Sequence, residues 1–398
     1  MPDLLAKAEE AMKGEDCATA ASALESVLSL ESDHLGATFN LAFCYTQLGR
    51  KPEAIEMYRE VLALDSKLFP AHLNLGLLLA DAGQLEDAVG HLAQAVDIKG
   101  DHATARLNYA RTLNRAGRYD EAERHYLETL KLQPELAEAH LELGRLYLSQ
   151  SDYARAEQAL LKALELDGSL LEVQRDLILL YEAQEKWPQA EERYRRYLSE
   201  QPDDHRLRAR LGEHYLRQGK TEAGIEELQR VFQAEPNRKD VARVLGEEYS
   251  KLRNFPEAIR YFQEALSGNP RDADLFDALG LSLLKNEQYI QAEEALRRAR
   301  ALDPTHPPAV EHLALVVYLQ ERYAEAVPLL ARVAQRPEPP PLLVFFLGNC
   351  YDHLGALHQA IESYERFLGF GKGQNPVREW QAEQRIIVLK KILERMGK

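Results

Sequence analysis

The sequence predicts an all-α fold in which antiparallel helix pairs stack into a solenoid. Apolar side chains recur at intervals of three and four residues, the spacing of one helix face. A pattern of two such helices then returns every 34 residues along most of the 398-residue chain. One pair cannot bury both of its apolar faces, so consecutive pairs must pack against one another.

Eleven blocks of 34 residues follow one another without an insertion, and the clearest of them is Ala137–Leu170. The blocks begin at Met1, Leu35, Phe69, Ala103, Ala137, Leu171, His205, Lys239, Ala273, Pro307 and Pro341. We therefore expect one continuous array over residues 1–374. Residues 375–398 lie beyond the last block and are expected to form a C-terminal capping helix.

Three columns of residues indicate how the two helices of each block pack. The eighth residue of a block is usually small: Ala8, Ala42, Gly76, Ala110, Gly144, Ile178, Gly212, Gly246, Gly280, Ala314 and Gly348. The twentieth is small throughout: Ala20, Ala54, Ala88, Ala122, Ala156, Ala190, Gly224, Ala258, Ala292, Ala326 and Ala360. The twenty-fourth is large: Leu24, Tyr58, Leu92, Tyr126, Leu160, Tyr194, Leu228, Phe262, Leu296, Leu330 and Tyr364. Small residues on both helices let them approach closely, and the large residue fills the space beside them.

The sixth and seventh blocks depart from this pattern. Ile178 replaces the usual small residue, and Glu185 replaces a glycine that is common in the turn. Gly224 lowers the helix propensity of the following block. The segment Gln184–Gly224 is therefore expected to be the least regular part of the array.

The expected C-terminal helix begins at a plausible N-cap, Asn375, which is followed by a proline. Trp380, Ile387, Leu389 and Ile392 can supply an apolar side. We expect this side to cover the last repeat. The alternative is that the helix binds a partner.

Composition excludes several classes of function. The net charge of −15 disfavours non-specific binding to nucleic acid, which requires a basic surface. No apolar run is long enough to span a membrane, and no signal peptide precedes the first block. We expect a cytoplasmic protein, or a periplasmic or secreted one if a signal peptide has been removed.

Signs of catalysis are also missing from the sequence. Its three cysteines are far apart and lack the spacing of a metal site or a disulfide framework. The histidines are scattered, and no phosphate-binding loop or nucleophile motif occurs. We therefore expect no enzyme activity, cofactor or metal.

Four motifs resemble the signature of the tetratricopeptide repeat family. They are LGRLY at Leu143–Tyr147, LGEHY at Leu211–Tyr215, LGEEY at Leu245–Tyr249 and LGNCY at Leu347–Tyr351. Prolines that close the second helix in this family match Pro134, Pro202, Pro236, Pro270 and Pro304. The resemblance implies a right-handed superhelix. Its concave groove would be lined by the second, fifth, sixth, ninth, twelfth and thirteenth residues of each first helix.

Three zones of this implied groove contain candidate partner-binding residues. The N-terminal zone is apolar with amides and contains Phe39, Asn40, Phe43, Asn74 and Asn108. Its asparagines recur every 34 residues and could hydrogen-bond the backbone of an extended peptide. The alternative is that asparagine is simply the usual residue at this position of the family.

The middle zone is charged and the C-terminal zone is apolar. The middle zone contains Arg111, Arg145, Arg175, Arg206, Arg210 and Arg243. These arginines could bind an acidic peptide, or they could pair with carboxylates of the protein itself. The C-terminal zone contains Tyr318, Phe345 and Phe346. These rings could contact a partner or lie beneath the C-terminal helix.

The resemblance implies a non-catalytic scaffold that binds a peptide or protein partner in the groove. The alternative is a recruitment or regulatory region of a larger multidomain enzyme or assembly, and self-association is also possible. Chaperone-binding members of the family hold a partner's C-terminal carboxylate with five polar residues. Arg206 and Arg210 suit two of those places, but Leu141, Arg145 and Asp176 do not match the other three. A clamp of that kind is therefore not expected.

Overall fold

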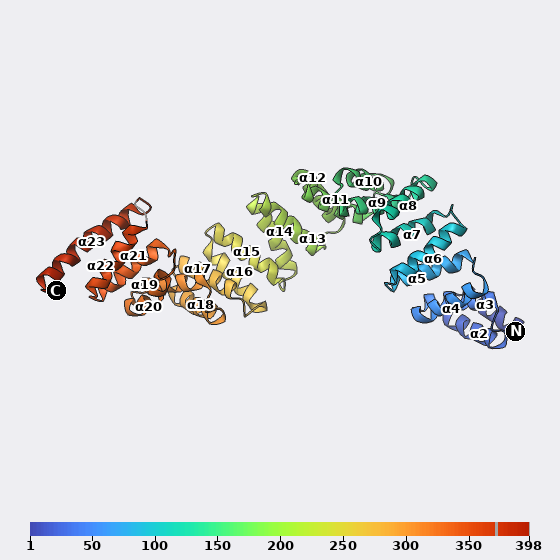
Figure 1. The fold of residues 1–398 in the computed structure, drawn as a ribbon, viewed down its shortest axis with the longest axis horizontal. Helices are drawn as coiled ribbons and strands as arrows, with labels where there is room; N and C mark the ends of the chain where they lie inside the picture. The colour runs from blue at the N-terminus through green and yellow to red at the C-terminus, as the bar shows by residue number, and fades with distance from the viewer. Residues whose placement is uncertain (371–372, 398) are drawn as a thin grey trace. The chain divides into compact units, whose positions relative to one another are not determined.

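A computed structural model describes residues 1–370 and 373–397 of the chain. All regular structure in these two ranges is α-helical, and the helices pack in consecutive pairs, so the expected all-α solenoid of helix pairs is confirmed (Figure 1). The chain divides into two compact units, Met1–Glu200 (unit 1) and Gln201–Lys398 (unit 2). The boundary between them falls inside Gln184–Gly224, where the repeat pattern is least regular.

Unit 1 consists of six helix pairs. They are α1 (Pro2–Lys13), α2 (Cys17–Leu30), α3 (Leu35–Gln47), α4 (Lys51–Leu64), α5 (Phe69–Asp81), α6 (Leu85–Ile98), α7 (Ala103–Arg115), α8 (Tyr119–Leu132), α9 (Ala137–Ser149), α10 (Tyr153–Leu166), α11 (Leu171–Ala183) and α12 (Trp187–Glu200). The first helix of each pair from α3 onward begins where a 34-residue block begins.

Unit 2 contains five helix pairs and a last, longer helix in its described residues. They are α13 (His205–Arg217), α14 (Thr221–Ala234), α15 (Lys239–Lys251), α16 (Phe255–Gly268), α17 (Ala273–Lys285), α18 (Tyr289–Leu302), α19 (Pro307–Leu319), α20 (Tyr323–Ala334), α21 (Pro341–His353), α22 (Leu357–Gly369) and α23 (Pro376–Arg395). The last helix packs against α22.

The turn inside each pair has one residue with a positive φ angle, always the fifteenth of the block. Glycine occupies this position at Gly49, Gly83, Gly117, Gly219 and Gly355. Other residues occupy it at Glu15, Ser151, Glu185, Arg253, Glu287 and Glu321, with φ between 55° and 60°. The left-handed conformation is unfavourable for a residue with a Cβ atom. The turn geometry is therefore imposed by the packing of the two helices, since the local sequence at these six positions does not favour it.

Side-chain caps fix where several of the first helices begin. Nδ1 of His34, His102 and His306 accepts a hydrogen bond from the backbone N–H three residues later, at 3.0–3.2 Å. Aspartate fills the same position at Asp204 and Asp272. Such a cap satisfies one of the backbone donors that a helix leaves unpaired at its start. The repeated histidines are therefore helix caps.

The core follows the three columns. Every large residue at the twenty-fourth position is at most 2 % exposed. A Cβ atom added to Gly144 would lie 2.8 Å from Cγ of Leu160, and one added to Gly348 would lie 2.8 Å from Cδ1 of Tyr364. The small eighth residue thus faces the large residue of the second helix directly.

The last helix buries a face that matches the expected one only in part: Leu389 is buried and Ile392 packs against the core, as expected. Ala382, Ile386, Leu389 and Leu393 are buried, at intervals of four, three and four residues. Ile387 is exposed and Trp380 is 62 % exposed, so the expectation that both cover the last repeat is wrong. Helical geometry explains the difference, because residues 380 and 387 lie on another side of a helix whose positions 382, 386, 389 and 393 face α22.

Candidate functional site

A hollow opens between α3 and α5 on the side of unit 1 formed by the first helices. Its volume is about 300 Å³. We call it the N-terminal hollow; it is lined by Phe43, Thr46, Gln47, Tyr58, Asn74, Leu77, Leu78 and Asp81. Two of the predicted partner-binding residues, Phe43 and Asn74, therefore meet at one site.

One hydrogen bond organises the floor of the N-terminal hollow. Nδ2 of Asn74 donates to the phenolic oxygen of Tyr58 at 3.0 Å. Burial raises the pKa of Tyr58, which keeps the hydroxyl protonated. The ring of Phe39 packs edge-on against Tyr58, with their centroids 5.8 Å apart. Phe43 is 37 % exposed and can contact a bound group.

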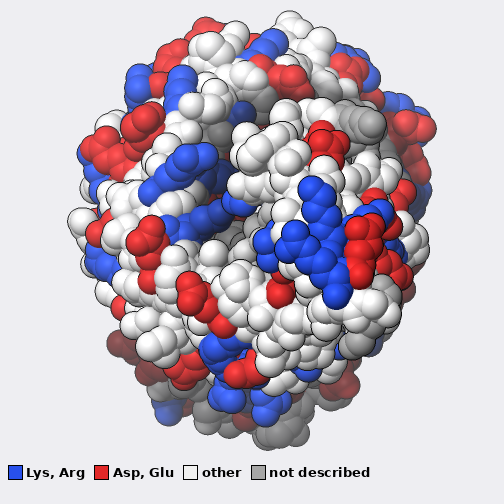
Figure 2. All heavy atoms as spheres, turned by 90° about the vertical axis from the view of Figure 1, so that its left-hand side faces the viewer, with Lys and Arg blue, Asp and Glu red and all other residues white. Residues whose placement is uncertain are grey.

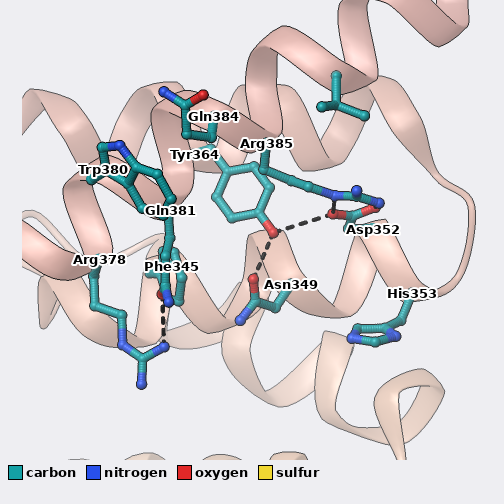
Figure 3. A pocket seen from close by; sticks show the side chains of 11 residues that line it. Phe345, Asn349, Asp352, His353, Tyr364, Arg378, Trp380, Gln381, Gln384 and Arg385 are labelled. Atoms are coloured by element: carbon teal, nitrogen blue, oxygen red, sulfur yellow. Dashed lines mark hydrogen bonds and ion pairs between the residues drawn. The ribbon is translucent and has the colours of Figure 1, made fainter.

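A larger hollow lies between α21 and α23 in unit 2, and its lining side chains are shown in Figure 3. Its volume is about 780 Å³. We call it the C-terminal hollow; it is lined by Phe345, Asn349, Asp352, His353, Tyr364, Arg378, Trp380, Gln381, Gln384, Arg385 and Val388. Tyr364 is the twenty-fourth residue of its block, as Tyr58 is in the N-terminal hollow. The two hollows therefore occupy the same register of the repeat.

A network of polar contacts holds the wall of the C-terminal hollow. The hydroxyl of Tyr364 donates to Oδ1 of Asn349 at 2.6 Å, and Nδ2 of Asn349 donates to the hydroxyl of Tyr318 at 2.9 Å. Arg385 binds both carboxylate oxygens of Asp352, one of them at 2.8 Å. This bidentate pair joins α23 to α21 and fixes the width of the hollow.

The start of α23 places Arg378 and Trp380 together at one end of the hollow (Figure 3). The carboxylate of Glu379 accepts hydrogen bonds from the backbone N–H groups of Gly373 and Asn375 at 2.9–3.0 Å. These bonds satisfy donors at the beginning of the helix and fix its first turn. The guanidinium of Arg378 lies 5.4 Å from the ring centroid of Phe345, close enough for a cation–π contact.

Ion pairs bridge the first helices of unit 1 beyond the N-terminal hollow. Arg111 of α7 binds Glu138 and Glu142 of α9 at 2.6 and 3.3 Å. Arg145 of α9 binds Glu172 and Asp176 of α11 at 3.0 and 2.7 Å. Burial of Asp176 raises its pKa, although Arg145 acts in the opposite direction. For Arg111 and Arg145, the structure thus favours the internal ion-pair lattice over an acidic-peptide site.

The first helices of unit 2 are bridged in a similar way before the C-terminal hollow. Arg243 of α15 binds Asp272 at 3.2 Å and Glu247 at 3.0 Å. Nδ1 of His312 in α19 lies 2.8 Å from Oδ1 of Asp277 in α17. Farther along, the rings of Tyr318 and Phe346 stack with centroids 4.5 Å apart. Side chains of neighbouring repeats thus occupy much of this surface.

The remaining residues that were predicted to bind a partner differ from one another in how exposed they are. Phe345 is only 2 % exposed and packs against Phe346, Tyr364 and Phe367, which favours the alternative that this ring is covered by the protein itself. The reason is that its side chain belongs to the core between α21 and α22. Arg175 and Arg206 are exposed on α11 and α13, whereas the side chains of Asn40, Asn108 and Arg210 are half-buried.

Sequence reasoning assigned Tyr58 and Tyr364 to the core and missed their role in the hollows. The available signal was the hydroxyl, because the same column accepts leucine in six blocks that need no polar group there. Arg378 and Arg385 were not singled out because they lie outside the 34-residue pattern. Trp380 was assigned to the wrong side of α23.

Metal-binding clusters and membrane-spanning helices are both missing from the described residues. Residues 1–370 and 373–397 contain no group of three or more His, Cys, Asp or Glu side chains placed to hold a metal ion. Within the same ranges, no helix combines the length and the apolar character needed to cross a bilayer.

Solved structures that are similar to this chain include MamA proteins and a tetratricopeptide repeat protein. MamA is 22 % identical over 40 % of this chain and 94 % of its own, with a TM-score of 0.40. MamA from Desulfovibrio magneticus is 18 % identical over 42 % of this chain and 94 % of its own, with a TM-score of 0.41. A tetratricopeptide repeat protein from Parabacteroides merdae is 20 % identical over 63 % of this chain and 98 % of its own, with a TM-score of 0.46. No curated protein matches the sequence.

Family models match the sequence in both units. Tetratricopeptide repeat models match residues 5–68, 68–135, 110–169 and 181–247. The model of the middle TPR-like domain of cilia and flagella-associated protein 70 matches residues 242–366. These matches agree with the helix pairs and their 34-residue spacing. The chain belongs to the tetratricopeptide repeat family, whose members generally serve as protein-interaction scaffolds.

Proposed function

We propose that the chain is a non-catalytic scaffold that binds peptide segments of a protein partner on the surface formed by its first helices. The observation that carries this proposal is the pair of hollows at the same register of the repeat, one in each unit. In both, a tyrosine of a second helix forms the floor, the first helix of the same block forms one wall, and the next helix along the chain forms the other. Repeated concave sites of this kind suit an extended chain that contacts several helices.

The N-terminal hollow has the chemistry needed to hold an apolar side chain and the backbone beside it. Phe43 and Leu77 supply an apolar wall. Nδ2 of Asn74 is used by Tyr58, but its Oδ1 can accept a hydrogen bond from a peptide N–H. A volume of about 300 Å³ is at the lower end of ligand pockets, which suits one or two side chains.

Internal ion pairs and ring contacts occupy the rest of the surface formed by the first helices, which supports the hollows as the partner-binding sites. Arg111 and Arg145 each already bind two carboxylates, and Tyr318 and Phe346 already stack on each other. A partner would have to break these contacts to bind there. Binding at the two hollows requires no such rearrangement.

Partner capture with matched variants tests the proposal. We expect Phe43→Ala and Trp380→Ala to reduce the amount of captured partner, and the two changes together to abolish capture, because few interface residues supply most of the binding energy. Leu64→Ala removes an apolar side chain of intermediate exposure, 45 % against 37 % for Phe43 and 62 % for Trp380, from α4, away from both hollows, and should leave capture unchanged.

Circular dichroism would show that each variant remains folded. Capture that persists in the Phe43→Ala, Trp380→Ala double variant would show that the partner binds elsewhere, and the proposed function would then be wrong.

A further inference from the structure

The C-terminal hollow combines basic and aromatic side chains in a way that the N-terminal hollow does not. We propose, on the basis of the function above, that it binds a peptide segment in which an acidic side chain lies next to a large apolar one. Arg378 pairs with the carboxylate, and Trp380 covers the apolar side chain.

The charge of the hollow favours an acidic ligand. Its lining contains Arg378 and Arg385 against a single carboxylate, Asp352. Arg385 already binds both oxygens of Asp352, so the two charges compensate each other. Arg378 is exposed and donates to the neutral Oε1 of Gln381 at 2.9 Å; within the described residues it forms no ion pair. An uncompensated arginine remains available in a protein whose net charge is −15.

The aromatic wall favours an apolar neighbour of that carboxylate. Trp380 is 62 % exposed, and Val388 of the same helix is also exposed toward the hollow. Exposed tryptophan and arginine are the residue types most often responsible for binding energy at protein interfaces. Figure 3 shows Trp380 and Arg378 at the same end of the hollow, so one short segment can reach both.

The size of the hollow and its amides favour a peptide segment over a single small group. A volume of about 780 Å³ holds several side chains. Gln381 and Gln384 line the same wall and can hydrogen-bond a peptide backbone. Figure 2 views unit 2 from the end that carries α23 and shows basic and acidic side chains interspersed with uncharged ones on this face.

The N-terminal hollow serves as an internal comparison. Its lining contains no lysine or arginine and one carboxylate, Asp81. The acidic preference is therefore expected at the C-terminal hollow alone. A peptide that binds through Phe43 should show no preference for acidic residues.

A display library of random dodecapeptides, selected on the full chain, tests the inference. Peptides whose binding is lost in Trp380→Ala should be enriched in Asp or Glu beside aromatic or aliphatic residues. These peptides would then be synthesised with a fluorescent label, together with analogues in which Glu and Asp become Gln and Asn. Arg378→Gln should weaken the acidic peptides about tenfold, the effect of losing one partly exposed charged hydrogen bond.

Two controls make the result specific. Arg298→Gln removes an exposed arginine from α18, outside the hollow, and should change no affinity. The uncharged analogues should bind Arg378→Gln and the unaltered chain equally. Raising the salt concentration should weaken only the acidic peptides.

The outcomes separate the inference from the proposed function. Peptides that depend on Trp380 without acidic enrichment, or without sensitivity to Arg378→Gln, would overturn the acidic preference and leave the scaffold function intact. If the binding of every selected peptide depends on Phe43 and not on Trp380, the inference about the C-terminal hollow is likewise overturned and the scaffold function stands. If no selected peptide depends on either Phe43 or Trp380, both the inference and the proposed function are wrong.

Discussion

The N-terminal and C-terminal hollows share a position in the repeat but differ in the helix that closes them. α5 closes the first and belongs to an ordinary helix pair, whereas α23 closes the second and lies beyond the last 34-residue block. The N-terminal hollow is small, apolar and faintly acidic. The C-terminal hollow is larger and carries two arginines and a tryptophan, all from α23. The repeat thus sets where a hollow forms, and the closing helix sets its chemistry.

The floors of the hollows show the same division. Tyr58 accepts a hydrogen bond from Asn74, which lies on the closing helix α5. Tyr364 donates to Asn349, which lies on the first helix of its own block. The closing helix α23 instead supplies Arg385, which binds Asp352. A tyrosine at the same position of the repeat therefore takes part in two different polar networks, because its neighbours differ.

The largest expected effect comes from the contact behind the floor of the C-terminal hollow. Gly348→Ala would place a Cβ atom 2.8 Å from two carbons of the Tyr364 ring. Relieving this overlap should destabilise unit 2 by about 1–3 kcal/mol. It should also displace the ring and weaken binding at the C-terminal hollow, while the N-terminal hollow is unaffected. Urea unfolding followed by circular dichroism measures the change in stability.

Gly90→Ala provides the matched control in unit 1. Gly90 lies within α6, and an added Cβ atom there meets no atom within 4 Å. This change should stabilise unit 1 by roughly 0.5–1 kcal/mol through helix propensity alone. Equal effects of the two substitutions would contradict the close packing between Gly348 and Tyr364.

A smaller effect is expected from the ion pairs that join the first helices of unit 1 outside the N-terminal hollow. Arg145→Met would remove the arginine that pairs with Asp176. The loss is costly because the Asp176 carboxylate is only 14 % exposed and water cannot fully replace the arginine. We expect a loss of about 1–2 kcal/mol, less than for a fully buried pair, because Arg145 is partly solvated. Thermal unfolding measures the loss. The control Arg175→Met, on the exposed surface of α11, should change stability by less than about 0.5 kcal/mol.

Much of the fold could be predicted because it depends on residues in the repeating columns. Gly144 and Leu160 meet as their spacing indicates, and the same packing recurs at Gly348 and Tyr364. The motif of small and large residues is local in sequence, so each pair specifies its own contact. The family could be identified from the same residues.

The candidate site could be predicted only in part. Phe43 and Asn74 follow the repeat and lie in a hollow, as their positions indicate. Whether Arg145 points to a partner or to Asp176 depends on distances between neighbouring helices, which periodicity does not contain. The orientation of Trp380 depends on which face of α23 meets α22, and no repeat sets that register.

The smallest expected effect concerns the acidic wall of the N-terminal hollow. Lys51 forms a hydrogen-bonded ion pair with Asp81, and this contact lowers the pKa of the Asp81 carboxyl. Lys51→Met should therefore raise the pKa of Asp81 toward its ordinary value. A carboxyl pKa that is lower in the folded than in the unfolded state stabilises the folded state at neutral pH. The contribution of the Lys51–Asp81 pair to the free energy of unfolding is therefore present above about pH 4, and it is lost as the pH falls through the folded-state pKa. Titration of Asp81 by nuclear magnetic resonance measures the change.

The same variant sharpens the comparison of the hollows. Without Lys51, the charge of Asp81 is uncompensated, and the N-terminal hollow should reject acidic peptides more strongly. The affinity of the C-terminal hollow for the same peptides should not change, since neither residue lines it. A Lys51→Met chain that binds acidic peptides more tightly at the N-terminal hollow would show that charge does not distinguish the two sites. In that case apolar contacts, with Phe43 in one hollow and Trp380 in the other, would have to account for any selectivity.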